Sequence, residues 1–357
     1  MRIGEVYAER SERGAEDMEL LSVTMNDGVK MRSDIEGKDN SSEDKSNYKI
    51  VRAGDMVYNS MRMWQGANGI SPWNGIVSPA YTVLKPRIPI SNGFFAALFK
   101  THRLINEFRK NSQGMTSDTW NLKYPQIETI KTCIPALAEQ EKIADFLMAL
   151  DQRIEQQRTL VEHLKKYKRG VVKAIFSGKL NLSAEYPFEI WENKAICECL
   201  KYEQPQKYIV ATEKYDDSFT TPVLTANKGF ILGYTDEQQG IYDKGDVIIY
   251  DDFTMDMKYV TFNFKVKSST IKMLTPTQGN DLYFMYSLLQ SLELQPEGHQ
   301  RSYISKVEPM IVQVPPYELQ LHISEFLKNI DDRVVFAEKQ LALLVTQKQG
   351  LMQGLFA

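Results

Sequence analysis

The sequence is poor in the residues that build disulfide frameworks and metal sites. It contains three cysteines, Cys133, Cys197 and Cys199, and four scattered histidines among 357 residues. So few cysteines, in an odd number, indicate a reducing compartment. The Cys197–Cys199 pair has no companion ligands at the spacing of a zinc site, so we expect both to be buried thiols and predict no metal.

Long hydrophobic runs are also missing. No apolar stretch approaches the ~20 residues that a membrane-spanning helix needs. The amino-terminal segment MRIGEVYAERSERGAED is polar and unlike a signal peptide. We therefore expect a cytoplasmic protein with no membrane partner. The net charge of −3 excludes a bulk polycation, so any nucleic-acid surface must be a local basic patch.

Familiar catalytic signatures are absent from the sequence as well. It has no glycine-rich phosphate loop of the Walker type and no Asn/Asp-Pro-Pro-aromatic tetrapeptide of the adenine-methylating kind. Its histidines form no zinc-type pair. Glu43-Asp44-Lys45 imitates a nuclease E-x-K motif, but it lies in the polar stretch SSEDKSN, which is typical of a solvated loop. These absences favour a binding subunit and predict no catalytic residues.

What the sequence does contain is one long helical pattern that occurs twice. Residues 134–176 align with residues 314–356 at a constant offset of 180, without a gap. Prolines stand near the start of each copy, just ahead of the expected helix, where they cannot disturb the helical hydrogen bonds. A fold with two equivalent long helices is suited to a target in two parts. The eleven identical positions include Gln140/Gln320, Asp151/Asp331, Lys168/Lys348 and Phe176/Phe356.

Apolar residues in both copies recur in steps of four and three, which is the heptad pattern of a coiled coil. The pattern lasts for about five heptads, ending at Ile175 and Leu355. A helix of ~37 residues is about 55 Å long and cannot bury such a stripe alone, so we expect the two copies to pack on each other. The predicted core of the helix pair is Ile143, Leu147, Leu150, Ile154, Val161, Leu164, Ile323, Leu327, Ile330, Val334, Leu341 and Leu344.

Each copy places a lysine at the same core position, Lys168 in the first and Lys348 in the second. Polar groups in such a seam reduce stability but fix register and orientation. Two interpretations are open at this point. Each ammonium could reach water along its apolar stem, or it could meet a carboxylate on a partner subunit.

The segments ahead of the two helices repeat more faintly. Residues 53–58 parallel residues 244–249, and residues 81–86 parallel residues 271–276. Each segment has short β-branched and aromatic runs cut by Gly, Asn and Asp, which predict strands and turns, followed by an amphipathic helix. The pattern predicts an α+β fold. We expect two pseudo-repeated α/β domains, each with a mixed or antiparallel sheet, separated by a pair of long antiparallel coiled-coil helices.

The amphipathic helices are expected within FFAALFKTHRLINEFRK (94–110) and DLYFMYSLLQSLELQ (281–295). A polar stretch, SGKLNLSAEYP, forms an exposed connection between the two halves. The predicted boundaries are 1–133 for the first domain, 134–178 for the first long helix, 179–187 for the linker, 188–313 for the second domain and 314–357 for the second long helix.

The two copies differ most where loops are expected, which is typical of two modules that read different targets. These loops mix Arg and Lys with Trp, Tyr, Gln and Asn, types that contact phosphates, stack on bases or bond to base edges. The alternative is that Trp64 and Trp73 belong to the core and that the charges are merely solvated. The candidate DNA-binding residues are Arg62, Trp64, Gln65, Asn68, Trp73, Asn74, Arg109, Lys110, Gln113, Lys123, Gln204, Lys207, Tyr208, Asn227, Lys228, Thr254, Lys258, Arg301 and Lys306.

The first long copy resembles the central conserved region of specificity (S) subunits of type I restriction–modification systems. The resemblance rests on Pro-x-x-x-x-Gln-x-x-Ile-x-x-Phe-Leu, then Asp-x-Arg-Ile, then the basic run Lys-Lys-Tyr-Lys-Arg-Gly. The second copy resembles the distal conserved region, with Leu319 in place of the usual Glu and the basic run reduced to Lys348. The segments KYEQPQKYIV, TPVLTANKGFILGYT and DDFT resemble one recurring type of target-recognition domain.

The resemblance implies a DNA sequence-recognition subunit without turnover of its own. Each target-recognition domain would read one half of a split double-stranded DNA site, and the helix pair would set the spacer. Two modification subunits would bring S-adenosylmethionine, and two restriction subunits would bring ATP- and Mg-dependent translocation and cleavage, so no cofactor is expected in this chain. The domain at the amino terminus has no counterpart of residues 188–193, which leaves its starting edge open.

Two other functions are compatible with the residues alone. A coiled-coil assembly scaffold could use its flanking domains to bind protein partners. A stand-alone methyltransferase is the third possibility, which methyl transfer by the isolated chain would reveal. A DNA-binding experiment distinguishes the DNA-recognition subunit from the assembly scaffold. Sequence-selective and strongly salt-dependent binding is expected only of a DNA-recognition subunit.

Overall fold

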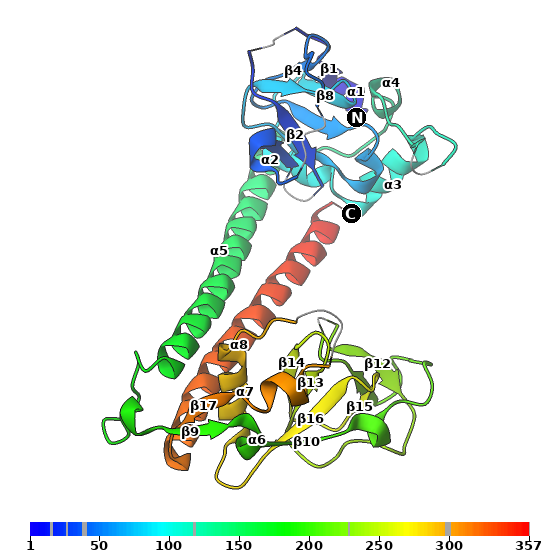
Figure 1. Cartoon of the computed structure of the whole chain (residues 1–357). Coiled ribbons are helices and arrows are strands. Elements are labelled where there is room, and N and C mark those ends of the chain that lie inside the picture. The colour runs from blue at the N-terminus through cyan, green and yellow to red at the C-terminus, as the bar shows by residue number, and fades with distance from the viewer. Residues whose placement is uncertain are drawn as a thin grey trace. The chain divides into compact units, whose positions relative to one another are not determined.

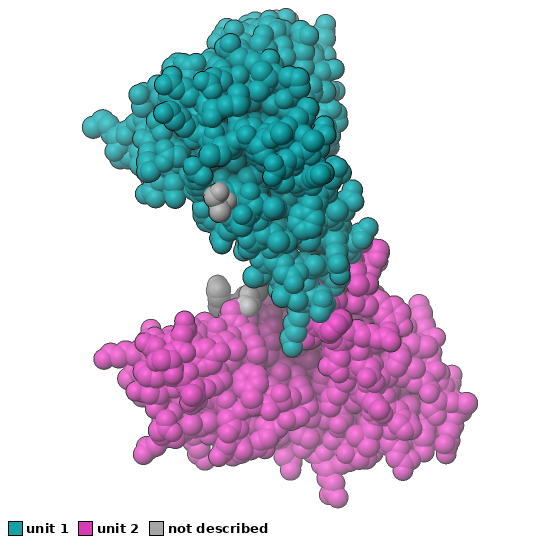
Figure 2. All heavy atoms as spheres, turned by 180° about the vertical axis from the view of Figure 1, so that it is seen from behind, with its two compact units in different colours: residues 1–158, 339–357 teal, residues 159–338 magenta. Residues whose placement is uncertain are grey.

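The computed structural model divides the chain into two compact units, shown in different colours in Figure 2. Unit 1 comprises residues 1–158 and 339–357, and unit 2 comprises residues 159–338. Each unit holds one α+β domain together with a part of each long helix. The structure describes residues 1–14, 17–25, 28–37, 41–116, 119–227, 229–296 and 301–356.

A four-stranded antiparallel sheet forms the centre of the unit 1 domain, in the order β1–β8–β5–β6. Both of its faces are covered: Met56, Tyr58 and Leu84 pack against helices, whereas Val57 and Val83 pack under two small two-stranded sheets. Burial on both sides explains why the central strands are almost continuously apolar. The strands are β1 (Tyr7–Glu9), β2 (Leu21–Thr24), β3 (Gly28–Met31), β4 (Lys49–Val51), β5 (Met56–Asn59), β6 (Asn68–Ile70), β7 (Gly75–Val77) and β8 (Tyr81–Pro86).

The unit 2 domain repeats this sheet in the order β10–β16–β13–β14 (Figure 1). The sequence parallels fall on the two central strands of each sheet, so the predicted pseudo-repeat and the α+β class are confirmed. Unit 2 adds a mixed sheet in which β11 runs parallel to β15. Its strands are β9 (Glu192–Ala195), β10 (Leu200–Glu203), β11 (Thr221–Leu224), β12 (Ile231–Thr235), β13 (Val247–Asp251), β14 (Met257–Val260), β15 (Lys265–Val266), β16 (Ile271–Pro276) and β17 (Ile311–Val314).

The amphipathic helix expected at residues 94–110 is two helices, α2 and α3. The helix breaks because the Thr101 side chain caps α3, accepting from the Leu104 N–H at 3.4 Å, while its hydroxyl donates to the Leu98 carbonyl at 2.8 Å. In unit 2 a single helix, α7, occupies the corresponding place. The shorter helices are α1 (Ile3–Val6), α2 (Asn92–Leu98), α3 (His102–Asn111), α4 (Tyr124–Ile127), α6 (Ile196–Cys199) and α7 (Leu282–Ser291).

Short 3-10 and π segments complete the domains. Residues 303–307 form one π turn in unit 2. Among the cysteines, Cys199 is buried as expected, but Cys197 is exposed. The correction follows from the single turn of α6, in which Ile196 and Cys199 face the core and Cys197 faces outward. The 3-10 turns are Arg32–Asp34, Met63–Gln65, Phe188–Ile190 and Pro205–Tyr208.

The repeated sequence forms two long helices, α5 (Leu137–Phe176) and α8 (Tyr317–Leu355). At the carboxyl end of α8 the buried stripe stops earlier than expected, because Leu351 and Leu355 are exposed. No helix in the described part of the chain is both long and apolar enough to cross a membrane. Of the predicted core positions, Leu147, Ile154, Val161, Ile323, Leu327, Ile330, Val334 and Leu344 are buried, and Ile143, Leu150, Leu164 and Leu341 are half-buried.

The seam lysines bind carboxylates of the other helix. In unit 2, Lys168 Nζ lies 2.5 Å from Asp331 Oδ1, and in unit 1 the equivalent Lys348 pairs with Asp151. Both earlier interpretations, water and a partner subunit, were therefore wrong, because each lysine finds its carboxylate within the chain. Partly exposed pairs of this kind contribute only about 0–1 kcal/mol, so they define the antiparallel register more than they stabilise it.

A repeated glutamine joins each domain to the helix that follows it. Gln320 Oε1 accepts from the Asp281 N–H at 2.9 Å, at the start of α7, and its Nε2 donates to the Pro315 carbonyl at 2.9 Å. In unit 1 the equivalent Gln140 accepts from the Ser91 N–H at 3.1 Å, at the start of α2. Both glutamines are buried. This identical bond explains why the sequence repeat keeps glutamine at that position.

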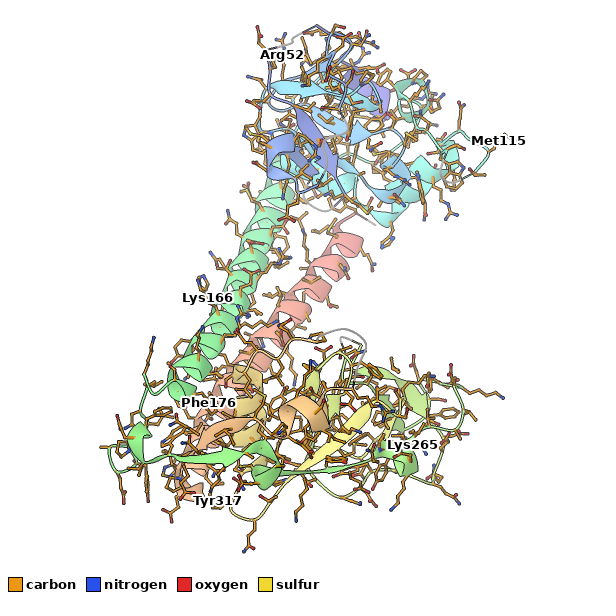
Figure 3. The ribbon with its side chains drawn as sticks, viewed as in Figure 1. Arg52, Met115, Lys166, Phe176, Lys265 and Tyr317 are labelled. Atoms are coloured by element: carbon orange, nitrogen blue, oxygen red, sulfur yellow. The ribbon has the colours of Figure 1, made fainter. Side chains whose placement is uncertain are left out.

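A repeated phenylalanine ends each long helix against a domain. Phe176, at the end of α5, lies 5.4 Å from the Phe284 ring in unit 2, and Figure 3 shows it beside the body of that unit. Phe356, just beyond α8, lies 5.3 Å from the Phe94 ring in unit 1. Each domain is therefore attached both to the beginning of one long helix and to the end of the other.

We predict that Gln320→Ala lowers the free energy of unfolding by about 2 kcal/mol, because it leaves the half-buried Asp281 N–H and the buried Pro315 carbonyl without partners. Urea unfolding followed by circular dichroism measures the change. Gln152→Ala, an exposed position on α5, is the matched control and should change stability by less than about 0.5 kcal/mol. Equal effects of the two substitutions would contradict the role given to Gln320.

Candidate nucleic-acid interface

In unit 1 the central strand β5 leads directly into the turn formed by residues 59–62. The buried Ser60 and Thr82 hydroxyls lie 2.8 Å apart, which ties the turn to β8. The Ser60 carbonyl accepts from the Leu122 N–H at 2.8 Å. These bonds hold the turn rigidly and leave Arg62 exposed at the domain surface. A guanidinium presented from such a turn can contact a phosphate or a guanine edge.

An aromatic and cationic cluster adjoins this turn. The Trp64 indole N–H donates to the Met61 carbonyl at 3.1 Å. Its ring meets the Trp120 ring edge-on at 5.2 Å, and the Arg109 guanidinium lies 5.5 Å from the Trp120 ring centre. Sequence reasoning missed Trp120. The signal that could have identified it was an aromatic residue in the polar stretch between the candidates Gln113 and Lys123.

Asn68 is not available for DNA. It is fully buried, and its Nδ2 donates to the Phe99 carbonyl at 3.4 Å, so the prediction for Asn68 is corrected to a structural role. Trp73 is half-buried against the core of the sheet, as the alternative interpretation held. Asn74 is exposed, although its Oδ1 accepts from the Ala53 N–H at 3.0 Å. Its amide nitrogen therefore remains the group that faces solvent.

The other unit 1 candidates lie at the surface. Figure 3 shows Met115, which is fully exposed, at the tip of the loop that follows α3. An exposed apolar side chain of this kind near basic residues is suited to groove contact. The exposed candidates are Arg62, Asn74, Arg109, Lys110, Gln113 and Lys123, and the half-buried ones are Trp64, Gln65 and Trp73.

In unit 2 the turn at the equivalent place, after β13, is built around Asp251. Its Oδ1 accepts from the Phe253 N–H at 2.9 Å and the Thr254 N–H at 3.0 Å, and its Oδ2 accepts from the Thr270 hydroxyl at 2.9 Å. The exposed Thr254 hydroxyl in turn donates to Asn227 Oδ1 at 3.0 Å. The structure thus brings together two candidates, Asn227 and Thr254, that are far apart in the sequence.

The next residue, Asp252, is the centre of a buried network. Its Oδ1 accepts from the Ser302 N–H at 3.0 Å and from the Tyr303 N–H at 2.8 Å. Its Oδ2 lies 3.4 Å from Lys272 Nζ, with the Lys272 and Asp252 side chains 1% and 2% exposed. Lys272 Nζ also donates to Gln204 Oε1 at 3.0 Å. One buried ion pair therefore positions the candidate Gln204 and the segment that follows Arg301.

Tyrosine rings surround this ion pair. The Tyr202 ring centre lies 5.3 Å from Lys272 Nζ, and the Tyr303 ring lies 5.7 Å from Tyr202 and 5.3 Å from Tyr250. Burial raises the pKa of Tyr250 to about 12, so its hydroxyl stays protonated and bonds to Ser302 Oγ at 3.1 Å. The rings close the pocket of Lys272 to water and strengthen its electrostatic contacts.

Tyr208 is corrected to a structural role. It is buried, and its hydroxyl donates to Glu203 Oε1 at 2.9 Å. Lys244 binds the same carboxylate at 2.7 Å, and this hydrogen bond holds the pKa of Glu203 below its usual value. The contacts secure the 3-10 turn, while its neighbour Lys207 is exposed.

The remaining candidates of unit 2 do not all fall in one place. Arg301 is exposed and Lys306 is half-buried, and both adjoin the segment that Asp252 holds. Lys258 lies apart from them, on β14. Lys228 lies outside the described residues.

Lys258 lines a cleft of about 670 Å³ that sequence reasoning did not identify. The cleft lies within unit 2, between β14, the segment after α7 and the long helices. Its basic lining includes Arg169 and Lys173 of α5, which have no ion pair among the described residues. The signal that could have indicated this cleft was the basic run of the first long helix, which we interpreted only as part of the family resemblance.

Among the described residues, no group of three or more His, Cys, Asp or Glu side chains is arranged to hold a metal ion. The two domains instead share one design. In both, the turn after the central strand is fixed by buried bonds, and different exposed side chains surround it. That arrangement is chemically suited to binding and recognition.

Comparison with known proteins shows which proteins the chain resembles. Residues 26–165 match the type I restriction modification DNA specificity domain. The EcoR124I/EcoR124II specificity subunit of Escherichia coli is 47% identical over 124 residues, which are 33% of this chain and 31% of that protein. The chain is thus similar in sequence to type I restriction–modification specificity subunits. The putative MjaX specificity subunit of Methanocaldococcus jannaschii is 22% identical over 285 residues.

The chain spans less than two thirds of each curated relative, since the M. jannaschii match covers 71% of this chain and 64% of that protein. Solved structures align over its whole length. The S subunit from M. genitalium has a TM-score of 0.62 at 15% identity, covering 100% of this chain and 95% of the other. The HsdS subunit from Thermoanaerobacter tengcongensis has a TM-score of 0.51 at 16% identity, with coverages of 100% and 95%. At such identities these matches establish the fold, and they confirm the predicted class.

We predict that Lys272→Met lowers the free energy of unfolding of the protein by about 3–5 kcal/mol, because it leaves the Asp252 carboxylate buried without its counter-ion. Adding Asp252→Asn should recover most of the loss. Lys267→Met, which breaks a more exposed pair with Glu213, is the control and should cost less than about 1 kcal/mol. Denaturant unfolding measures all three, and a double variant no more stable than Lys272→Met would count against a coupled pair.

Proposed function

We propose that this specificity subunit is the DNA sequence-recognition subunit of a type I restriction–modification complex. One observation carries the proposal: the two domains place different polar, basic and aromatic side chains around the same rigid turn of a repeated sheet. A shared scaffold with changed surface chemistry is expected when two modules bind the same kind of molecule but discriminate different sequences. We infer that the protein is cytoplasmic, because its DNA target is accessible in that compartment.

We further propose that each target-recognition domain reads one half of a bipartite site in the major groove and that the helix pair sets the spacer. The helix α5 has 40 residues and is therefore about 60 Å long. Half-sites separated by one helical turn of DNA, roughly 34–36 Å, are within the reach of such a helix. A stiff strut would keep this spacing constant, whereas a flexible linker would not.

Partner subunits would dock on the outer faces of the helices. Phe146, Leu160 and Tyr167 on α5 are 49%, 47% and 56% exposed, and they recur at multiples of seven residues. On α8, Phe336 and Leu343 are 65% and 50% exposed and are also seven apart. Such stripes suit partner helices. We propose two modification subunits, which bring S-adenosylmethionine, and two restriction subunits, which bring ATP and Mg, with no turnover in this chain.

Duplex DNA binding tests the recognition role. The specificity subunit together with the modification subunit should shift a random-sequence duplex pool on native gels, and selection should enrich a motif in two parts. Affinity should fall steeply as salt rises, because phosphate contacts release counterions. A pool that remains unshifted at low salt would favour the coiled-coil scaffold instead.

Exchanging residues 1–133 for another recognition domain should change one half of the enriched motif and leave the other half unaltered.

We predict that Leu160→Arg with Phe336→Arg weakens binding of the modification subunit by at least about tenfold, because buried aromatic and aliphatic anchors dominate interface energies. Co-purification and analytical ultracentrifugation measure the loss. Gln156→Arg, a change at an exposed polar position of α5, is the matched control and should retain the subunit. Circular dichroism should show the same helical content in both proteins. Full retention in the double variant would rule out docking through this surface.

A further inference from the structure

The buried ammonium of Lys272 determines how the Gln204 amide is oriented. Lys272 Nζ lies 3.0 Å from Gln204 Oε1. An ammonium group carries hydrogen-bond donors and no acceptor, so the amide atom that faces it must be the oxygen. The two N–H donors on the amide nitrogen of Gln204 are therefore the groups left for other partners.

The surroundings of Lys272 keep this orientation in place. Its Nζ lies 3.4 Å from Asp252 Oδ2 and 5.3 Å from the centre of the Tyr202 ring, and its side chain is 1% exposed. Water cannot replace any of these partners at such burial. Turning the amide of Gln204 would place its N–H donors against a buried cation, which is costly in a low-dielectric environment.

Gln204 is half-buried and belongs to the candidate interface of unit 2. It stands between β10 and the 3-10 turn at Pro205–Tyr208. The Asp252 carboxylate that holds Lys272 also fixes the segment beginning at Ser302, next to the exposed Arg301. Within the described part of the chain, Gln204 Nε2 donates to no protein group, in contrast to its engaged oxygen.

We propose that Gln204 is a specificity-determining residue that selects a base with acceptor atoms on its major-groove edge. This inference rests on the proposed DNA-recognition function. A glutamine that reads adenine donates to N7 and accepts from the N6 amino group. Gln204 cannot do both, because Lys272 occupies its oxygen. Its donors fit N7 and O6 of guanine, O4 of thymine or N7 of adenine, and they do not fit the amino groups N4 of cytosine and N6 of adenine.

The proposal predicts a reversal of base preference when the outward group is changed from donor to acceptor. In Gln204→Glu, one carboxylate oxygen replaces the amide oxygen beside Lys272 and the other becomes an outward acceptor. The base pair enriched at one position of one half-site should then change, because an outward acceptor fits an amino group, N4 of cytosine or N6 of adenine, in place of N7, O6 or O4. Gln204→Ala removes the head group without adding charge and should reduce discrimination at that position by about tenfold.

The experiment selects a random-sequence duplex pool with the full specificity subunit bound to its modification subunit, for wild type and each variant, and sequences the bound DNA. Gln278→Glu is the matched control, because it makes the same chemical change at an exposed residue. Gln278 follows the end of β16, whereas Lys272 lies near the beginning of that strand. It should leave the motif as in wild type. The half-site read by unit 1 should be unchanged in every variant.

The outcomes separate the two hypotheses. A wild-type protein that enriches no motif would overturn the proposed function itself. A wild-type motif that Gln204→Glu and Gln204→Ala both leave unaltered would overturn only the role of Gln204. If Gln204→Glu fails to fold, the expected loss of discrimination in Gln204→Ala decides alone.

Discussion

A long helix with an apolar stripe cannot remain exposed in water, and this constraint organises the whole chain. In each unit the stripe is buried against the other long helix and against the domain. Gln140 and Gln320 join each domain to the helix that follows it, while Phe356 and Phe176 attach the ends of the helices. Within each unit, the domain and its parts of the two long helices therefore pack as one body.

Polar residues in the helix pair serve register more than stability. The repeat places the same two side chains, a lysine and an aspartate, so that each helix supplies the partner of the other. A shift by one heptad would separate both pairs and leave charges in the seam. Two weak, equivalent bonds thus select one alignment of two helices whose apolar stripes alone would permit several.

The turns that follow β5 and β13 lie at equivalent places of the repeated sheet, but different bonds hold them. Both turns follow the central strand, but unit 1 anchors its turn with the Ser60 and Thr82 hydroxyls and unit 2 with the Asp252 and Lys272 ion pair. The ion pair has a consequence that the hydroxyl pair lacks. Because a buried ammonium must be surrounded by acceptors, it dictates the orientation of a surface amide, and buried electrostatics thereby determine the chemistry presented outside.

Periodicity by itself determined the long helices, the duplicated domains and the α+β class, because apolar spacing and turn residues act locally along the chain. The break between α2 and α3 was not predictable, since Thr101 caps a helix without interrupting its apolar pattern. Residue type alone also placed Asn68 and Tyr208 among the surface candidates, and packing buried both. A polar side chain has the same composition whether it faces solvent or a buried carbonyl.

Only the tertiary structure decided which residues work together. The partner of Lys168 is Asp331, which is 163 positions away. Gln204, which follows β10, is oriented by Lys272 of β16. No local pattern encodes such pairs, because they arise where separate elements meet. The sequence thus determined the elements and their repetition. Burial and long-range contacts decided which side chains form the core, which fix the register of the long helices and which remain free to bind.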